Sequence, residues 1–276
     1  MNNLVVEELI RQALKEDIGA GDITSQAIFT DDHYSEGYLL AKEELVLAGK
    51  DIFSRVYSLL DRQIKIAFRY NDGDKIPSGE KFAILKGPTR SLLSGEKVAL
   101  NFLQRMSGIA TETWRFVQAV GGTAAIIAHT RRTTPGLRIL ERYAVKVGGG
   151  KSHRYGLDYM ALIKDNHIQA AGGITQAVEK IRQQLSPFVK IEIEVETLDQ
   201  VREAVTAGVD VIMLGNMSDT MLEQAVAIVD KQTLVEVSGN IPIERVSELA
   251  ALGVDIISSG LITHSVRAVD ISIKLQ

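Results

Sequence analysis

The sequence predicts an α/β protein in two parts, a small antiparallel α+β layer followed by an open or six-stranded α/β barrel. Short alternating or apolar segments separated by turn signals fill residues 34–93. From residue 124 onward, six apolar runs recur with helical segments between most of them. Near-continuous apolar strands alternating with helices are typical of a parallel sheet covered by helices. Six runs are too few for the common closed barrel of eight strands.

The first part begins with an amphipathic helix over residues 3–16, after which Asp22 is expected to form a turn or to cap the next segment. Strand and hairpin patterns come next, with a helix near residues 50–60 among them. A long helix is predicted to begin with Ser94 as its N-cap and to break at Ser107-Gly108. We place the domain boundary at this break, so the expected domains are residues 1–107 and 108–276. Alternatively, the last residues of the chain return to the first domain.

The second part contains the six predicted strands, at 124–129, 159–167, 189–196, 210–216, 233–240 and 254–260. The helices between them are expected at 136–148, 174–185, 198–207, 219–230 and 243–252. In such folds the chemistry lies at the carboxyl ends of the strands.

Composition excludes several classes of protein. The 276 residues include no cysteine, so disulfides and thiolate metal sites are excluded. The net charge of −4 and an aromatic content of 5% argue against a nucleic-acid groove. No apolar run approaches the ~20 residues that span a bilayer, and the acidic N-terminus does not read as a signal peptide. We therefore expect a cytoplasmic protein that binds neither nucleic acid nor membrane.

Residues 129–168 concentrate positive charge, with eight Lys or Arg against three acids in a chain that is acidic overall. Such a concentration indicates a site for a small, highly charged anion. The alternative is a solvated basic helix face. Arg131 and Lys164 favour the anion site, because they follow the apolar runs AAIIA and MALI, where buried strands end.

The other strand ends are consistent with a ligand that carries phosphate. Cations follow the first two strands, Glu194 ends the third, and Gly- and Ser-containing loops follow the last two. Lys164 could instead be a Schiff-base lysine, as in barrel aldolases. His129 and His167 are as consistent with hydrogen-bonded scaffold as with catalysis.

At these positions the sequence resembles the quinolinate phosphoribosyltransferases. The matching segments are EDIGAGDIT (16–24), LNFLQRMSGIAT (100–111), HTRRTTPGLR (129–138), GGGKSHRYGL (148–157), LIKDNHI (162–168), IEIEVETL (191–198), VSGNI (237–241) and GVDIISSGLITHS (253–265). They occur in order across nearly the whole chain, so together they are highly specific.

The resemblance implies an N-terminal α/β sandwich, an open six-stranded α/β barrel and a homodimer or higher homo-oligomer. It implies conversion of quinolinate and phosphoribosyl pyrophosphate to nicotinate mononucleotide, pyrophosphate and CO2, with Mg2+, in NAD biosynthesis. Lys164, Glu194 and Arg132 become the expected catalytic residues, and Glu194 the expected metal ligand.

The same resemblance implies the residues that bind substrate. Those expected to hold the two carboxylates of quinolinate are Arg131, His153, Arg154 and Lys164. Arg132 would meet the phosphoribosyl substrate, Glu194 its ribose hydroxyls, and Lys97 would reach the partner subunit's site. Those expected at the 5-phosphate are Ser238, Gly239, Asn240, Ser258, Ser259 and Gly260.

The chain departs from the family pattern at four positions. Arg132 stands where the family usually has Lys, and Lys97 stands where it usually has Arg. Ser152 stands where the family often has Asn. Gly215 stands where the family has Asp, so a carboxylate expected at the ribose or metal is absent. Two alternatives follow, a paralogue that uses another aromatic acid or donor and a silent anion-binding protein.

Overall fold

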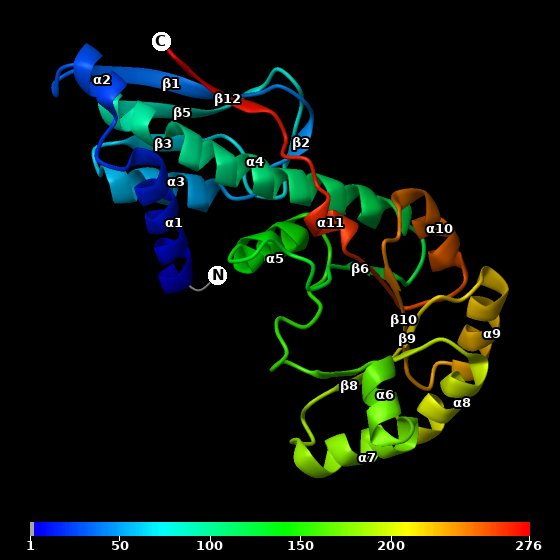
Figure 1. Ribbon diagram of the computed structural model, residues 1–276. Helices are drawn as coiled ribbons and strands as arrows, with labels where there is room; N and C mark the ends of the chain where they lie inside the picture. The colour runs from blue at the N-terminus through cyan, green and yellow to red at the C-terminus, as the bar shows by residue number, and fades with distance from the viewer. Residues whose placement is uncertain (1–2) are drawn as a thin grey trace. The chain divides into compact units, whose positions relative to one another are not determined.

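The computed structural model describes residues 3–276, which form two compact units. The first unit comprises the chain up to Trp114 together with Thr134–Gly149 and Ser265–Gln276. The second comprises Arg115–Thr133 and Gly150–His264. Figure 1 shows an antiparallel sheet in the first and a parallel sheet with helices in the second, which confirms the predicted fold class. The domain limits 1–107 and 108–276 stay a prediction.

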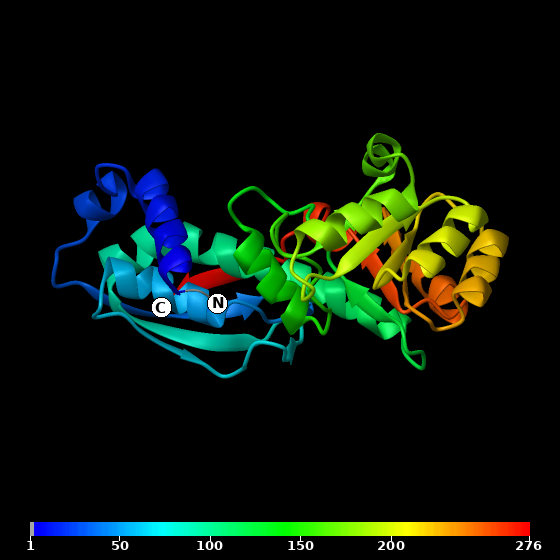
Figure 2. The same cartoon turned by 90° about the horizontal axis from the view of Figure 1, so that it is seen from below.

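The first unit is built on a four-stranded antiparallel sheet in the order β12-β1-β5-β3. These strands are β1 (Tyr34–Ala41), β3 (Lys65–Phe68), β5 (Lys81–Pro88) and β12 (Ile271–Leu275), and β2 (Leu45–Val46) pairs with β4 (Lys75–Ile76). Its helices are α1 (Asn3–Ile18), α2 (Ile23–Ile28), α3 (Lys50–Leu60), α5 (Arg138–Val147) and most of α4 (Thr89–Ala119). Figure 2 shows α3 and α4 on one face of this sheet.

The expected capping role of Asp22 is confirmed. Its side chain accepts a hydrogen bond from the backbone N–H of Ser25 and caps the N-terminus of α2. The hydroxyl of Ser94 also donates to Asp22, at 3.1 Å.

Helix α4 corrects two expectations. It begins at Thr89 and runs unbroken to Ala119, so Ser94 is not its N-cap and Ser107-Gly108 is not a break. Packing explains the small residues. The buried Ser107 hydroxyl accepts the backbone N–H of Ala48, and a Cβ on Gly108 would lie 2.4 Å from the carbonyl oxygen of Arg267. Gly108 is therefore needed for a close approach of the backbone, which outweighs its low helix propensity.

The second unit is built on six parallel strands in the order β6-β11-β10-β9-β8-β7. They are β6 (Ile126–Ala128), β7 (Ala161–Ile163), β8 (Ile191–Val195), β9 (Val211–Leu214), β10 (Leu234–Gly239) and β11 (Ile256–Ser259). Strands β6 and β7 lie at the two ends of this order. Among the residues described they do not pair with each other, so the sheet is open.

Helices follow most strands of this sheet. The predicted ones are α7 (Ile174–Gln184), α8 (Leu198–Ala207), α9 (Asp219–Val229) and α10 (Ile243–Ala251). Two others, α6 (Asp165–Ala171) and α11 (Leu261–His264), were not predicted, and α6 begins within the run 159–167 that was expected to be strand. Their apolar faces pack on the strands, whose residues are largely buried. Across residues 3–276, none of the helices combines the length and apolarity that crossing a membrane requires.

Candidate active site

A cavity of about 370 Å³ opens within the second unit, at the carboxyl end of the parallel strands. Its lining residues are Thr130, Arg131, Arg132, His153, Arg154, Leu162, Lys164, Glu194, Met213, Glu236, Ser238, Gly239 and Ser258. Nine of the thirteen residues expected to bind substrate are among them. The location agrees with the rule that sites in α/β sheets form where strands end.

Several cations line the cavity. Arg131 and Arg132 follow β6, and Lys164 follows β7, the strands at the two ends of the sheet order. Arg154 is buried, and burial together with the nearby charge of Arg131 lowers its pKa. Positive charges held this close repel each other, and an anion bound between them relieves that repulsion.

Lys164 forms an ion pair with Glu194, whose Oε2 lies 2.5 Å from Nζ. Both side chains are partly exposed, so the pair opens to an incoming ligand at modest cost. The backbone N–H of Lys164 donates to Nδ1 of His167 at 3.0 Å, which fixes the start of α6. This contact favours the scaffold interpretation of His167. His129 is fully buried and its Nδ1 bonds to the carbonyl of Thr130, which favours the same interpretation.

Gly215 lies beside Glu194 just after β9. A Cβ built on Gly215 would lie 3.4 Å from Oε1 of Glu194, an ordinary contact, and its φ is outside the left-handed region. Neither space nor backbone therefore demands glycine here. The next residue, Asn216, donates its amide to Glu196 at 2.6 Å and does not line the cavity, so it does not replace the missing carboxylate.

The small residues at the ends of β10 and β11 divide into two groups. Ser238, Gly239 and Ser258 line the cavity, whereas Asn240, Ser259 and Gly260 do not. The Ser259 hydroxyl is buried and donates to the carbonyl of Ile241, a structural role.

Asn240 and Gly260 lie against the side chain of Arg132. The Asn240 side-chain oxygen accepts Nη1 of Arg132 at 2.7 Å. A Cβ on Gly260 would lie 3.0 Å from Cδ of Arg132, so a side chain at 260 would press on the arginine. The carbonyl of Arg132 also accepts the Thr263 hydroxyl at 2.7 Å. These contacts hold Arg132 at the edge of the cavity.

Lys97 does not line the cavity. It lies on α4 in the first unit, exposed and 3.2 Å from the Glu96 carboxylate. Its expected role toward a partner subunit stays a prediction.

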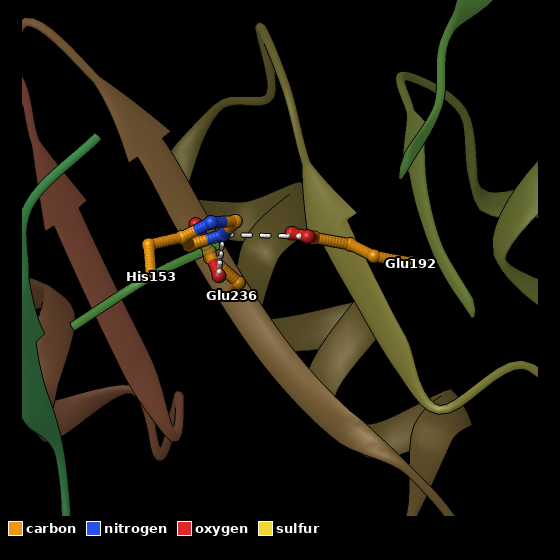
Figure 3. Close-up of side chains that lie close together, drawn as sticks. All are labelled: His153, Glu192 and Glu236. Atoms are coloured by element: carbon orange, nitrogen blue, oxygen red, sulfur yellow. Dashed lines mark ion pairs between the residues drawn. The ribbon is translucent and has the colours of Figure 1, made fainter. Parts of the chain in front are cut away.

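A buried cluster of His153, Glu192 and Glu236 lies against the cavity (Figure 3). Nε2 of His153 is 3.3 Å from Oε2 of each glutamate. Burial acts to lower the pKa of His153, but contact with the two carboxylates outweighs it and raises this pKa to about 10. Burial also raises the pKa of Glu192, and the charge of Glu236 adds to the effect while His153 opposes it.

Sequence reasoning missed Glu236 altogether and gave Glu192 no role. Glu236 is a single acid in the otherwise apolar first part of β10, and that isolation is the signal that was available for it. Glu192 shares β8 with Glu194, which drew the attention instead. The lining residues Thr130, Leu162 and Met213 were missed as well.

Comparison with known proteins shows similarity along the whole chain. The family models for quinolinate phosphoribosyl transferase match it, the N-terminal domain over residues 22–107 and the C-terminal domain over residues 109–274. A probable nicotinate-nucleotide pyrophosphorylase (carboxylating) of Bacillus subtilis is 44% identical over 275 residues, covering 100% of this chain and 95% of that protein.

Two crystal structures are similar over the full chain. NadC from Streptococcus pyogenes has a TM-score of 0.97 at 40% identity, covering 100% of this chain and 98% of that one. The nicotinate-nucleotide pyrophosphorylase of Francisella tularensis has a TM-score of 0.96 at 39% identity, with the same coverage.

Proposed function

The chain belongs to the quinolinate phosphoribosyltransferase family, and we propose on that premise that it uses the cavity of the second unit for the family's reaction. It is a nicotinate-nucleotide pyrophosphorylase (carboxylating), and its place is in NAD biosynthesis. One observation carries the proposal most directly. Cations and a group of Ser and Gly residues line one and the same cavity, as a dianionic acid and a phosphate ester together require.

Arg131, His153, Arg154 and Lys164 would hold the two carboxylates of quinolinate, because all four side chains line the cavity. Guanidinium groups bind carboxylates through two parallel hydrogen bonds, which also orients the ring. Ser238, Gly239 and Ser258 would face the phosphate, supported by backbone N–H groups.

The chemistry needs positioning and charge stabilisation more than covalent help. The ring nitrogen attacks the ribose as pyrophosphate departs, so positive charge develops on the sugar while negative charge accumulates on the leaving group. Glu194 faces the sugar in this arrangement, and Lys164 is released from it to the acid. Arg132, held by Asn240, would meet the phosphoribosyl substrate.

The proposal includes Mg2+, for which the cavity offers one partly exposed carboxylate, that of Glu194. Mg2+ usually binds one or two carboxylates together with substrate phosphates and water. Glu194 supplies one carboxylate, with Oε2 at Lys164 and Oε1 beside Gly215. When bound there with the substrate, the ion would neutralise charge on the pyrophosphate.

A homodimer in which Lys97 reaches the partner's cavity, and a cytoplasmic location, stay predictions that rest on the family resemblance. The high exposure of the Lys97 side chain, 71%, is consistent with the first.

Turnover tests the proposal. Purified protein with quinolinate, phosphoribosyl pyrophosphate and Mg2+ is expected to form nicotinate mononucleotide and CO2 in equal amounts. Nicotinate and other pyridine or aromatic acids serve as competing acceptors. Activity with one of these and not with quinolinate would favour the paralogue, and binding of the donor without any turnover would favour a silent anion-binding protein.

A further inference from the structure

Thr263 is a buried threonine whose hydroxyl reaches the backbone of a cavity residue. It lies in α11, which follows β11, and is 0% exposed. Its hydroxyl donates to the carbonyl oxygen of Arg132 at 2.7 Å and lies 3.2 Å from the carbonyl oxygen of Gly260. A hydroxyl has one proton, and the Gly260 carbonyl already accepts the backbone N–H groups of Thr263 and His264, at 3.1 and 2.9 Å. The proton of the hydroxyl therefore serves Arg132.

Neither the helix nor packing alone explains this hydroxyl. A threonine within a helix commonly turns its hydroxyl to a carbonyl of the preceding turn, whereas the shorter bond of Thr263 leaves the helix. A buried position that needed only the shape of the side chain would accept valine, because a buried hydroxyl costs free energy unless it finds a partner. Thr263 thus uses its hydroxyl to hold a residue that lies 131 positions away in the sequence.

The backbone of Arg132 is held on both sides of its Cα atom. Its N–H donates to the Thr130 hydroxyl at 3.1 Å, and its carbonyl accepts the hydroxyl of Thr263. Beyond the backbone, Nη1 donates to Asn240, and the stem passes so close to Gly260 that a Cβ there would lie 3.0 Å from Cδ. The exposed side chain can still adjust to a ligand, but the backbone from which it starts is fixed. Such preorganisation lowers the entropy that is lost when a ligand binds.

The Thr263 bond joins two segments that carry cavity residues. Strands β6 and β11 are neighbours in the sheet, with Ala128 opposite Ser258 in the register. Arg132 belongs to the loop after β6, Ser258 belongs to β11, and both line the cavity. Thr263 does not line the cavity, but it ties the loop after β6 to the helix that continues from β11. A cation and a hydroxyl suited to a phosphate ester are thereby held in place relative to each other.

We propose that Thr263 is a positioning residue for phosphoribosyl pyrophosphate, an inference that rests on the proposed function. Its hydroxyl holds the backbone of Arg132, so that the guanidinium meets this anionic substrate. Thr263 itself touches neither substrate. Three of the four residues proposed to bind quinolinate lie outside the loop after β6, namely His153, Arg154 and Lys164. The effect of Thr263 therefore falls mainly on phosphoribosyl pyrophosphate.

The test compares side chains that differ in the hydroxyl. Thr263→Val removes the hydroxyl and keeps nearly the same shape, whereas Thr263→Ser keeps the hydroxyl and loses a methyl group. Thr113→Val is the matched control, because Thr113 is also a fully buried helical threonine and its hydroxyl has no hydrogen-bond partner within residues 3–276. Steady-state rates give kcat and KM for each substrate with the other saturating, and urea unfolding gives the stability of each variant.

We expect Thr263→Val to raise KM for phosphoribosyl pyrophosphate about three- to tenfold, the size of one lost hydrogen bond, and to change KM for quinolinate less than about twofold. Thr263→Ser should stay within about twofold of the native protein for both substrates, and Thr113→Val should match the native protein. In an Arg132→Gln background, Thr263→Val should raise KM for phosphoribosyl pyrophosphate by less than about 1.5-fold, because a residue that acts through Arg132 then has nothing to position.

A second pair of variants covers the case in which Thr263→Val does not fold. Thr263→Ala and Thr263→Ser differ only in the hydroxyl, so the same difference in KM for phosphoribosyl pyrophosphate is expected between them. Equal KM values for this pair would contradict the proposal.

Three further results would overturn the proposal and leave the proposed function intact. The first is a KM for phosphoribosyl pyrophosphate that Thr263→Val leaves unchanged, as in the control. The second is an equal rise of KM for both substrates together with a loss of stability, which indicates a structural role only. The third is the full rise of KM in the Arg132→Gln background, which means that Thr263 acts by another route. Failure of the proposed function looks different, because the native protein would then form no nicotinate mononucleotide and have no KM to compare.

Discussion

The exposed cations that line the cavity, called here its wall, and the buried acids beside them differ in charge, burial and bonding. Arg131, Arg132 and Lys164 are exposed on loops that follow strands. Glu192 and Glu236 lie inside strands β8 and β10 and are buried. The exposed cations can adjust to a ligand, whereas the buried acids are fixed by the sheet before any ligand arrives.

This difference separates two tasks. Cations on loops provide affinity for anions at small cost to the fold, because water solvates them when the cavity is empty. Buried acids give up solvation and therefore affect stability and proton affinity instead. We infer that the wall controls binding and that the buried cluster controls protonation.

The largest effect is expected from removing a wall cation. Arg131→Gln should lower kcat/KM for quinolinate roughly 30- to 1000-fold, about 2–4 kcal/mol, since a carboxylate in a partly buried site loses its charged partner. Lys151→Gln is the control, an exposed cation of the same basic segment outside the cavity. Equal losses for both variants would mean that overall charge matters and not the wall.

The pH dependence of stability tests the buried cluster. The folded pKa of His153, about 10, lies above its unfolded value, so the stabilisation is complete below the unfolded pKa of 6.5 and is lost as pH rises toward 10. The raised pKa of Glu192 acts in the same direction. Between pH 7 and 9 the free energy of unfolding of the native protein should fall by roughly 1–2 kcal/mol more than that of His153→Gln/Glu192→Gln. Urea unfolding at several pH values measures it, and parallel curves would contradict the raised pKa of His153.

The variant Gly215→Asp adds a second carboxylate beside Glu194. The Cβ fits beside Glu194 without strain, so the second acid should lower the Mg2+ concentration for half-maximal activity by about three- to tenfold. Gly215→Asn has nearly the same shape without the charge and should leave the Mg2+ dependence unchanged. Identical behaviour of the two variants would show that Mg2+ does not meet this position.

Arg132→Lys should have the smallest effect. It keeps the charge and loses the fork that Asn240 holds, so KM for phosphoribosyl pyrophosphate should rise about two- to fivefold. Asn240→Ala should give the same rise if Asn240 acts only by orienting Arg132. A loss of a hundredfold in either variant would instead indicate a direct catalytic contact.

The sequence was sufficient for the fold because period and run length determine strands and helices. All six strands of the parallel sheet were predicted, since each is an apolar run between helical segments. The break at Ser107-Gly108 was wrong for a tertiary reason. Glycine there serves the approach of Arg267, a residue distant in sequence that no local pattern reveals.

The wall of the site could be predicted and the buried cluster could not. Strand ends are visible in sequence, so Arg131 and Lys164 were placed correctly at the cavity. Glu192 and Glu236 lie on strands β8 and β10, which β9 separates, and both contact His153 of the segment between β6 and β7. The strand order and the path of that segment have no signature in the spacing of residues.

Calorimetric titration of quinolinate into the native protein, Arg131→Gln and Glu192→Gln tests the separation of the two tasks most directly. We expect Arg131→Gln to weaken binding by about 30-fold or more, the binding share of one lost charge pair, and Glu192→Gln to change Kd by less than about threefold. Comparable losses in both variants would contradict the separation, because the buried acids would then belong to the binding site itself.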